Sequence, residues 1–69
     1  MKNKKAKCAP MINLKVMRVK NGLTLEALAE KSGLNYNTIS QYENGIHAPR
    51  MDNLKRIATV LNCDIKEIL

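Results

Sequence analysis

Amide side chains recur at helical spacing in the middle of the chain. Asn37, Gln41 and Asn44 follow one another at intervals of four and three residues, so they share one face of a helix over residues 35–44. Ile39 and Tyr42 fall on the opposite face. An Asn or Gln amide can bond adenine at two positions in the major groove of a duplex. The same residue types also populate ordinary solvent-exposed faces, so this feature alone leaves both interpretations open.

The segment just before this helix has the spacing of a tight bend between two helices. Thr24 is a suitable N-cap for the preceding helix. Ala29 and Gly33 lie four residues apart. A small residue at Ala29 lets the second helix cross the first closely, and Gly33 adopts a positive φ at little cost. Ile39 and Tyr42 would then hold the second helix on the core, which leaves its amide face free.

Three further helices complete an all-α pattern. The first carries Leu14, Met17 and Arg18 on one face and stops at Asn21-Gly22. Another has an apolar stripe made of Met51, Leu54, Ala58 and Leu61. A capping box in residues 64–67 then opens a short last helix. No sustained β-type alternation interrupts the pattern, so we expect five helices.

The net charge is concentrated in one part of the chain. Of 69 residues, twelve are Lys or Arg and six are Asp or Glu, and residues 1–22 hold seven of the basic residues and none of the acids. This basic end consists of an arm over residues 1–10, with Lys4, Lys5 and Lys7, and the first helix. The pattern favours a polyanionic partner, nucleic acid before an anionic membrane. A merely solvating tail is the alternative.

Catalytic and metal sites have little support in the residue types. Cys8, Cys63 and His47 are too few to ligate a structural metal, and no nucleophile–base set or phosphate-cradling loop is present. We expect no metal, no cofactor and no enzymatic activity. Without an export signal or a membrane-spanning run, we expect free thiols in a cytoplasmic protein.

Together, these segments resemble the phage repressor-like helix-turn-helix family, the Cro/cI type, also called the xenobiotic response element family. The resemblance rests on LKVMR, NGLTLEALAEKSGL, NTISQYENG, APRMDNLKRIATVLN and DIKEIL in this order. It implies a compact five-helix, lambda-repressor-like domain over residues 11–69, with a DNA-reading unit at about 24–45. It also implies a transcriptional regulator, most often a repressor, that places helix 35–44 in the major groove of double-stranded operator DNA.

The resemblance also assigns roles to individual residues. Expected base contacts are Tyr36, Asn37, Thr38, Ser40 and Gln41. The resemblance implies phosphate contacts at Asn44 and along the loop that ends at Arg50. We also expect phosphate contacts from Lys20, from Leu25 (through the backbone at its helix start) and from His47, for which a loop histidine that contacts nothing is the alternative. The family pairs the positions of Arg18 and Glu43 in a partly buried ion pair, and each lies on an apolar helix face, where an isolated charge would be costly.

Two positions depart from the family pattern. Leu25 stands where the family often has a phosphate-contacting Gln, so only backbone N–H groups remain at that helix start. Arg50 replaces the usual small capping residue before residues 51–61, which weakens the cap and offers a phosphate contact instead. An exposed, solvated Arg is the alternative.

A single such domain covers only a half-site, so we expect a homodimer on a palindromic operator. Because the sequence ends at Leu69, we expect no effector-sensing or proteolysis-controlled domain, and we expect the dimer contacts to come from this domain. The expected contacts are therefore apolar residues of the domain itself: Ile46, Ile65, Ile68 and Leu69. The alternative function is an antitoxin or other protein-interaction module of the same fold, with a toxin or antagonist as partner and DNA binding secondary.

Overall fold

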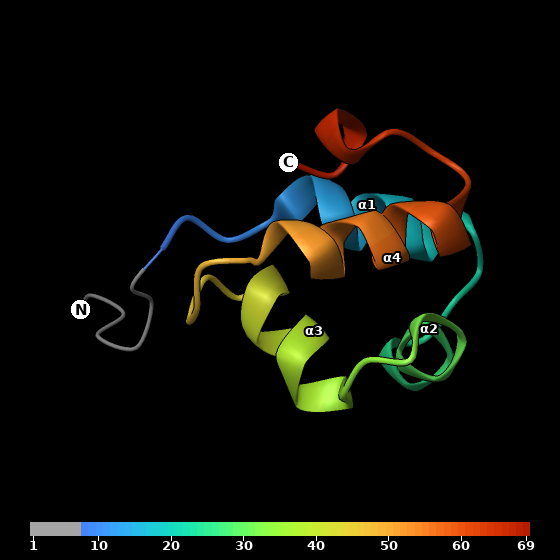
Figure 1. Cartoon of the computed structure of the whole chain (residues 1–69), viewed down its shortest axis with the longest axis horizontal. Coiled ribbons are helices and arrows are strands. Elements are labelled where there is room, and N and C mark those ends of the chain that lie inside the picture. The colour runs from blue at the N-terminus through green and yellow to red at the C-terminus, as the bar shows by residue number, and fades with distance from the viewer. Residues whose placement is uncertain (1–7) are drawn as a thin grey trace.

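The computed structural model describes residues 8–69, which form four α-helices and a final 3-10 turn (Figure 1). The elements are α1 (Ile12–Lys20), α2 (Leu25–Ser32), α3 (Tyr36–Glu43), α4 (Met51–Leu61) and η1 (Ile65–Glu67). The all-α expectation is confirmed, and no strand occurs in this part of the chain. The expected count of five helices is not confirmed in this part of the chain, because the last element is a 3-10 helix of three residues and the α-helices number four.

Side-chain caps fix where α2 and α3 begin. The Thr24 hydroxyl accepts a hydrogen bond from the N–H of Ala27 at 3.0 Å, and the side-chain Oδ1 of Asn35 accepts one from the N–H of Asn37 at 2.7 Å. Both bonds satisfy N–H groups that a helix start leaves without an intrahelical partner. Between the two helices Gly33 has φ +75°, the left-handed conformation that glycine adopts most easily. The Thr24 cap and the Gly33 turn agree with the sequence prediction.

The core lies between α1, α4 and the α2–α3 pair. In Figure 1, α2 and α3 lie on one side of α1 and α4, and η1 lies on the other. The largest fully buried side chains come from all four helices and the end of the chain: Leu14, Leu28, Ile39, Leu54, Ile57, Leu61 and Ile68. Each such side chain contributes about 1.5–3 kcal/mol by leaving water. This aliphatic core holds α3 in place without using its outer face.

The end of the chain folds back onto the start of α1 (Figure 1). The Glu67 carboxylate accepts a hydrogen bond from the N–H of Asp64 at 3.1 Å, and the Asn13 amide donates one to the carbonyl of Leu69 at 2.7 Å. This return path buries Ile68 completely. The expected dimer contact through Ile68 is therefore wrong, because the core of the monomer takes up its whole side chain.

Met51 also differs from expectation. The apolar stripe predicted for α4 begins with Met51, but this side chain is 56% exposed while Leu54, Ala58 and Leu61 are buried. Met51 is the first residue of α4. The helix start extends past the core, so helical spacing alone does not bury this residue.

A short segment before α1, residues 8–11, forms a strap across the end of α3. The N–H of Cys8 donates to the carbonyl of Gly45 at 2.7 Å, and the N–H of Met11 donates to the carbonyl of Tyr42 at 3.2 Å. Residues 8–10 of the expected arm thus lie against the domain. The arm residues Lys4, Lys5 and Lys7 fall outside the described residues.

Candidate nucleic-acid interface

The orientation of α3 is set by an ion pair with α1. The Arg18 guanidinium donates through Nε to Oε2 of Glu43 at 2.7 Å and through Nη2 to Oε1 at 3.2 Å. Its Nη1 donates to the carbonyl of Leu23 at 2.8 Å, in the loop that leads to α2. Both side chains are buried. Arg18 and Glu43 thus form the ion pair expected from the sequence, and Arg18 links α1, α3 and the start of α2.

The face of α3 opposite the core is rich in polar side chains. Tyr36, Asn37 and Asn44 are exposed, whereas Ser40 and Gln41 are half-buried. Ile39, Tyr42 and Glu43 point into the molecule. The amide side chains that the sequence places together therefore do share the outer face of α3.

A shallow hollow between α3 and α4 brings several of the predicted site residues together. Its lining comes from α3, the loop that follows it and the first turn of α4: Thr38, Gln41, Tyr42, His47, Ala48, Arg50 and Asn53. Two expected base-contacting residues, Thr38 and Gln41, thus border two expected phosphate-contacting residues, His47 and Arg50. A ligand that touches the C-terminal half of α3 would also meet this loop.

Tyr42 and Asn53 form a polar contact in this hollow that sequence reasoning missed. The Asn53 amide donates to the Tyr42 hydroxyl at 2.9 Å, and the N–H of Arg50 donates to the same oxygen at 3.4 Å. Tyr42 is otherwise buried, and a buried tyrosine hydroxyl usually finds a partner. That rule could have predicted from the sequence that the Tyr42 hydroxyl has a hydrogen-bond partner. The contact joins α3 to the start of α4 and fixes the loop between them.

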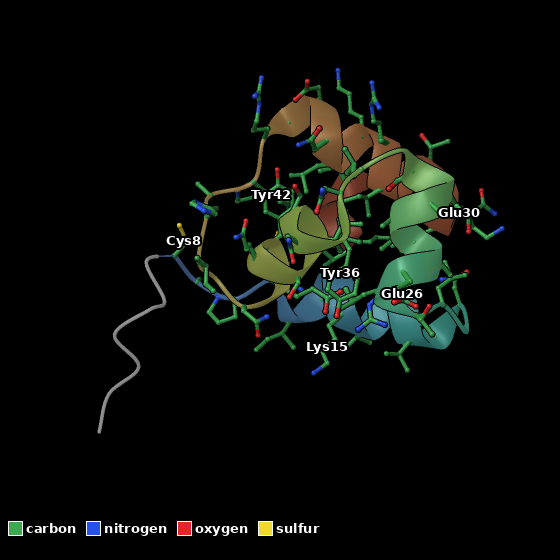
Figure 2. All side chains as sticks on the ribbon, turned by 90° about the horizontal axis from the view of Figure 1, so that it is seen from below. Cys8, Lys15, Glu26, Glu30, Tyr36 and Tyr42 are labelled. Carbon is green, nitrogen blue, oxygen red and sulfur yellow. The ribbon has the colours of Figure 1, made fainter. Side chains whose placement is uncertain are left out.

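A second hollow lies at the N-terminal ends of α2 and α3. Leu25, Glu26 and Tyr36 line it, with Arg18 and Thr24, and Figure 2 shows Glu26 and Tyr36 side by side. Leu25 and Tyr36 therefore border the same hollow, as a continuous interface requires. The Glu26 carboxylate favours the helix start itself but opposes an anion there. A phosphate contact at Leu25 must overcome this charge.

The remaining phosphate candidates differ in how free their side chains are. Lys20 is exposed at the last residue of α1. The Asn44 amide donates to the carbonyl of Ser40 at 2.8 Å, so it must turn away from α3 to reach a ligand. Arg50 lies 3.7 Å from the Asp52 carboxylate, and both side chains are largely exposed. An exposed pair of this kind is weak, so Arg50 can exchange Asp52 for another anion.

Neither cysteine lines the two hollows described above. Cys8 belongs to the strap, and Cys63 follows α4; both are free thiols. Burial raises the pKa of the Cys63 thiol, and the Glu67 and Asp64 carboxylates raise it further. A raised pKa keeps this sulfur protonated and unreactive near neutral pH. Within residues 8–69, no group of three or more His, Cys, Asp or Glu side chains has the arrangement to hold a metal ion.

This bent pair of helices, carried on a small helical core, defines a class of proteins. The sequence profile of the Helix-turn-helix family matches residues 14–68 of the chain. The chain belongs to this family. The expected Cro/cI-type, xenobiotic response element resemblance is confirmed.

Solved structures of bacterial regulators share the fold. The restriction-modification controller protein C.AhdI from Aeromonas hydrophila has a TM-score of 0.80 and 29% identity, with 84% of this chain and 88% of that chain covered. The N-terminal DNA binding domain of SinR from Bacillus subtilis has a TM-score of 0.77 and 28% identity over 84% and 88%. SinR, the master regulator for biofilm formation, has also been solved in complex with DNA; there the TM-score is 0.76 at 27% identity over 80% and 89%.

The sequence has no significant match among curated proteins. In the part of the chain that the structure describes, every helix is too short or too polar to span a lipid bilayer.

Proposed function

We propose that this chain is a sequence-specific, double-stranded DNA-binding transcriptional regulator that acts as a repressor. The outer face of α3 would enter the major groove, with Asn37 and Gln41 bonding base edges and Tyr36, Thr38 and Ser40 beside them. Asn and Gln suit adenine there because one amide can both donate to N7 and accept from the N6 amino group. Membership of the Helix-turn-helix family and the similarity to SinR, which has been solved with DNA, support this proposal.

The observation that carries the proposal is how firmly α3 is held while its amide face stays free. The bidentate Arg18–Glu43 pair and the Tyr42–Asn53 bond fix α3 from its inner side. None of the residues on the outer face of α3 belongs to the hydrophobic core. A rigid helix with an unused polar face is what direct readout of bases requires, because contacts must meet base edges in a fixed register.

Phosphate contacts would flank α3 on both sides. We propose His47, Arg50 and Asn44 at its C-terminal end, with Lys20 and the backbone at Leu25 at its N-terminal end. The strap brings residue 8 to Gly45, beside the end of α3. We propose that Lys4, Lys5 and Lys7, which precede this strap in the sequence, add phosphate contacts independent of sequence.

We further propose that two copies bind a palindromic operator, because one domain reads only a half-site. The apolar residues available for the dimer contact are Leu69, which is exposed, and Ile46 and Ile65, which are half-buried. The core takes up Ile68, so the contact would centre on Leu69 and Ile65.

A binding-site selection on random duplex DNA tests this function. The expected product is a palindromic motif with about 10 bp between half-site centres, bound with an affinity that falls log-linearly with salt. A complex that forms with every duplex equally would contradict sequence-specific regulation. Failure to form any complex at low ionic strength would contradict DNA binding altogether.

A further inference from the structure

The outer face of α1 carries an apolar stripe that neither the core nor the DNA interface uses. Ile12, Val16 and Val19 recur at intervals of four and three residues, on the side of the helix opposite Leu14. They are 65%, 47% and 58% exposed. Surface helices normally present polar residues on this side. β-branched residues also lower intrinsic helix stability, so local propensity gives no reason for three of them here.

Positive charge borders this stripe on both edges. By helical spacing, Lys15 falls on one edge of the stripe and Lys20 on the other, and both are exposed. Glu43 neutralises Arg18, the third basic residue of α1, on the inner side. Within the described residues, Lys15 and Lys20 make no salt bridge, and α1 contains no acid. Figure 2 shows Lys15 projecting away from the body of the protein.

A second copy of the chain fits this surface poorly. Two α1 helices packed stripe to stripe place Lys15 and Lys20 of each copy along the edges of the contact, with no carboxylate on either helix. Juxtaposed like charges oppose association. The surface therefore calls for a partner of opposite charge.

We propose that the α1 stripe docks an amphipathic α-helix of another protein whose apolar face has Asp or Glu on both edges. Apolar side chains at helical spacing on that partner would pack against Ile12, Val16 and Val19, and its acids would pair with Lys15 and Lys20. This geometry is the helix-on-helix form of peptide recognition, with charged edges that set orientation. The proposal goes beyond DNA binding. Lys20 is the one residue assigned to both surfaces, so a docked partner would compete with its phosphate contact.

A displayed library of helical 18-residue peptides, selected against the full chain, tests the proposal. The expected winners carry an apolar stripe with acids on both sides. They bind Val16→Gln at least tenfold more weakly than the parent and Lys15→Gln several-fold more weakly. Thr59→Gln, an exposed substitution on α4, is the matched control and leaves binding unchanged. An absence of winners, or winners that lack acids or are insensitive to Val16→Gln, overturns the proposal.

Two further measurements distinguish the proposed partner helix from a second copy of the chain and from a membrane as the ligand of the α1 stripe. Val16→Gln should sediment as the parent does; conversion from dimer to monomer would assign the stripe to a second copy. It should also leave unchanged any binding to vesicles containing phosphatidylserine; a loss would assign the stripe to a membrane. Duplex DNA binding by Val16→Gln should match the parent, which separates this proposal from the DNA-binding function. Val19→Gln repeats the test if Val16→Gln melts at a lower temperature.

Discussion

Arg18 and Glu43 illustrate how a single pair of residues can fix a helix. Three donor atoms of the guanidinium are used, two for the Glu43 carboxylate and one for the carbonyl of Leu23. Both ions are buried, so each depends on the other to offset its lost hydration. The sequence showed that each needs a partner, and the family resemblance identified which one. The additional bond to Leu23 depends on the path of the loop and was not foreseen.

Glu43→Ala should lower the free energy of unfolding by about 3–5 kcal/mol, because it leaves Arg18 buried without its counter-ion. Urea denaturation at low temperature measures the loss. Asp52→Ala is the control, since it removes the exposed pair with Arg50 and one exposed hydrogen bond from the N–H of Asn53, and should change stability by less than about 1 kcal/mol.

The double variant Arg18→Met/Glu43→Leu should recover most of the stability lost in Glu43→Ala, because an apolar pair no longer requires hydration or a counter-ion. A Glu43→Ala variant as stable as the parent would show that the pair does not hold α3.

Gln41→Ala should reduce discrimination at one base pair of the operator half-site by about 1–3 kcal/mol. Its affinity for the other positions should keep the parent's rank order. Titration of the selected duplex and its single-base variants measures this effect, and a thermal melt should stay close to that of the parent. A uniform loss on every duplex would instead assign Gln41 a role in phosphate contact.

At the level of elements, the sequence predicted best where a boundary depends on local chemistry. Thr24, Asn35 and Gly33 act within a few residues of their own positions, so their types reveal the α2–turn–α3 unit. The strap and η1 depend on segments distant in sequence. Nothing near Gly45 indicates that residues 8–10 cross it, and the DIKE capping box is equally compatible with an α-helix and with the 3-10 turn observed.

A comparison of Gly45 with Gly22 separates the cost of an unfavourable backbone conformation from the cost of a steric clash. Both have positive φ, +72° and +71°, but a Cβ at Gly45 would overlap the carbonyl of Cys8 and lie 2.8 Å from the nitrogen of Pro10, whereas Gly22 has nothing within 4 Å. Gly22→Ala should cost about 1–2 kcal/mol for backbone conformation. Gly45→Ala should cost about 1–3 kcal/mol more, because the strap must move.

Chemical denaturation of the two variants checks this difference. Equal losses would show that the strap contributes nothing at Gly45. Hydrogen exchange at the N–H of Cys8 should quicken in Gly45→Ala and stay unchanged in Gly22→Ala.

Across the whole molecule, the distribution of charge agrees with separate proposed roles for the basic N-terminal segment, which would contact phosphates, and for α3, which would contact bases. The basic residues concentrate in the first third of the chain, while the α3 face carries amides. The positions of the basic residues in the sequence show this asymmetry directly. It cannot predict that Ile68 fills the core or that Met51 extends past it, because both outcomes depend on how α1, α4 and η1 pack.

Deletion of residues 1–7 should weaken binding to all duplexes by the same factor. It should also make the dependence of log K on log salt shallower, by up to about 0.9 for each phosphate that a lysine of the arm neutralises in the parent complex. Fluorescence anisotropy at several salt concentrations, with operator and scrambled duplexes, measures both effects. Weaker binding to the operator alone would show that the arm reads sequence.

The most direct test of the outer face of α3 as the DNA-reading surface is a titration of ¹⁵N-labelled protein with the selected operator duplex, followed by NMR. We predict that the largest shift changes fall on residues 36–44, the loop at 46–50 and the start of α2, and that Ile12, Val16 and Val19 change little. Large changes confined to α1 or η1, with the side-chain amides of Asn37 and Gln41 unmoved, would contradict the assignment of α3 as the reading helix.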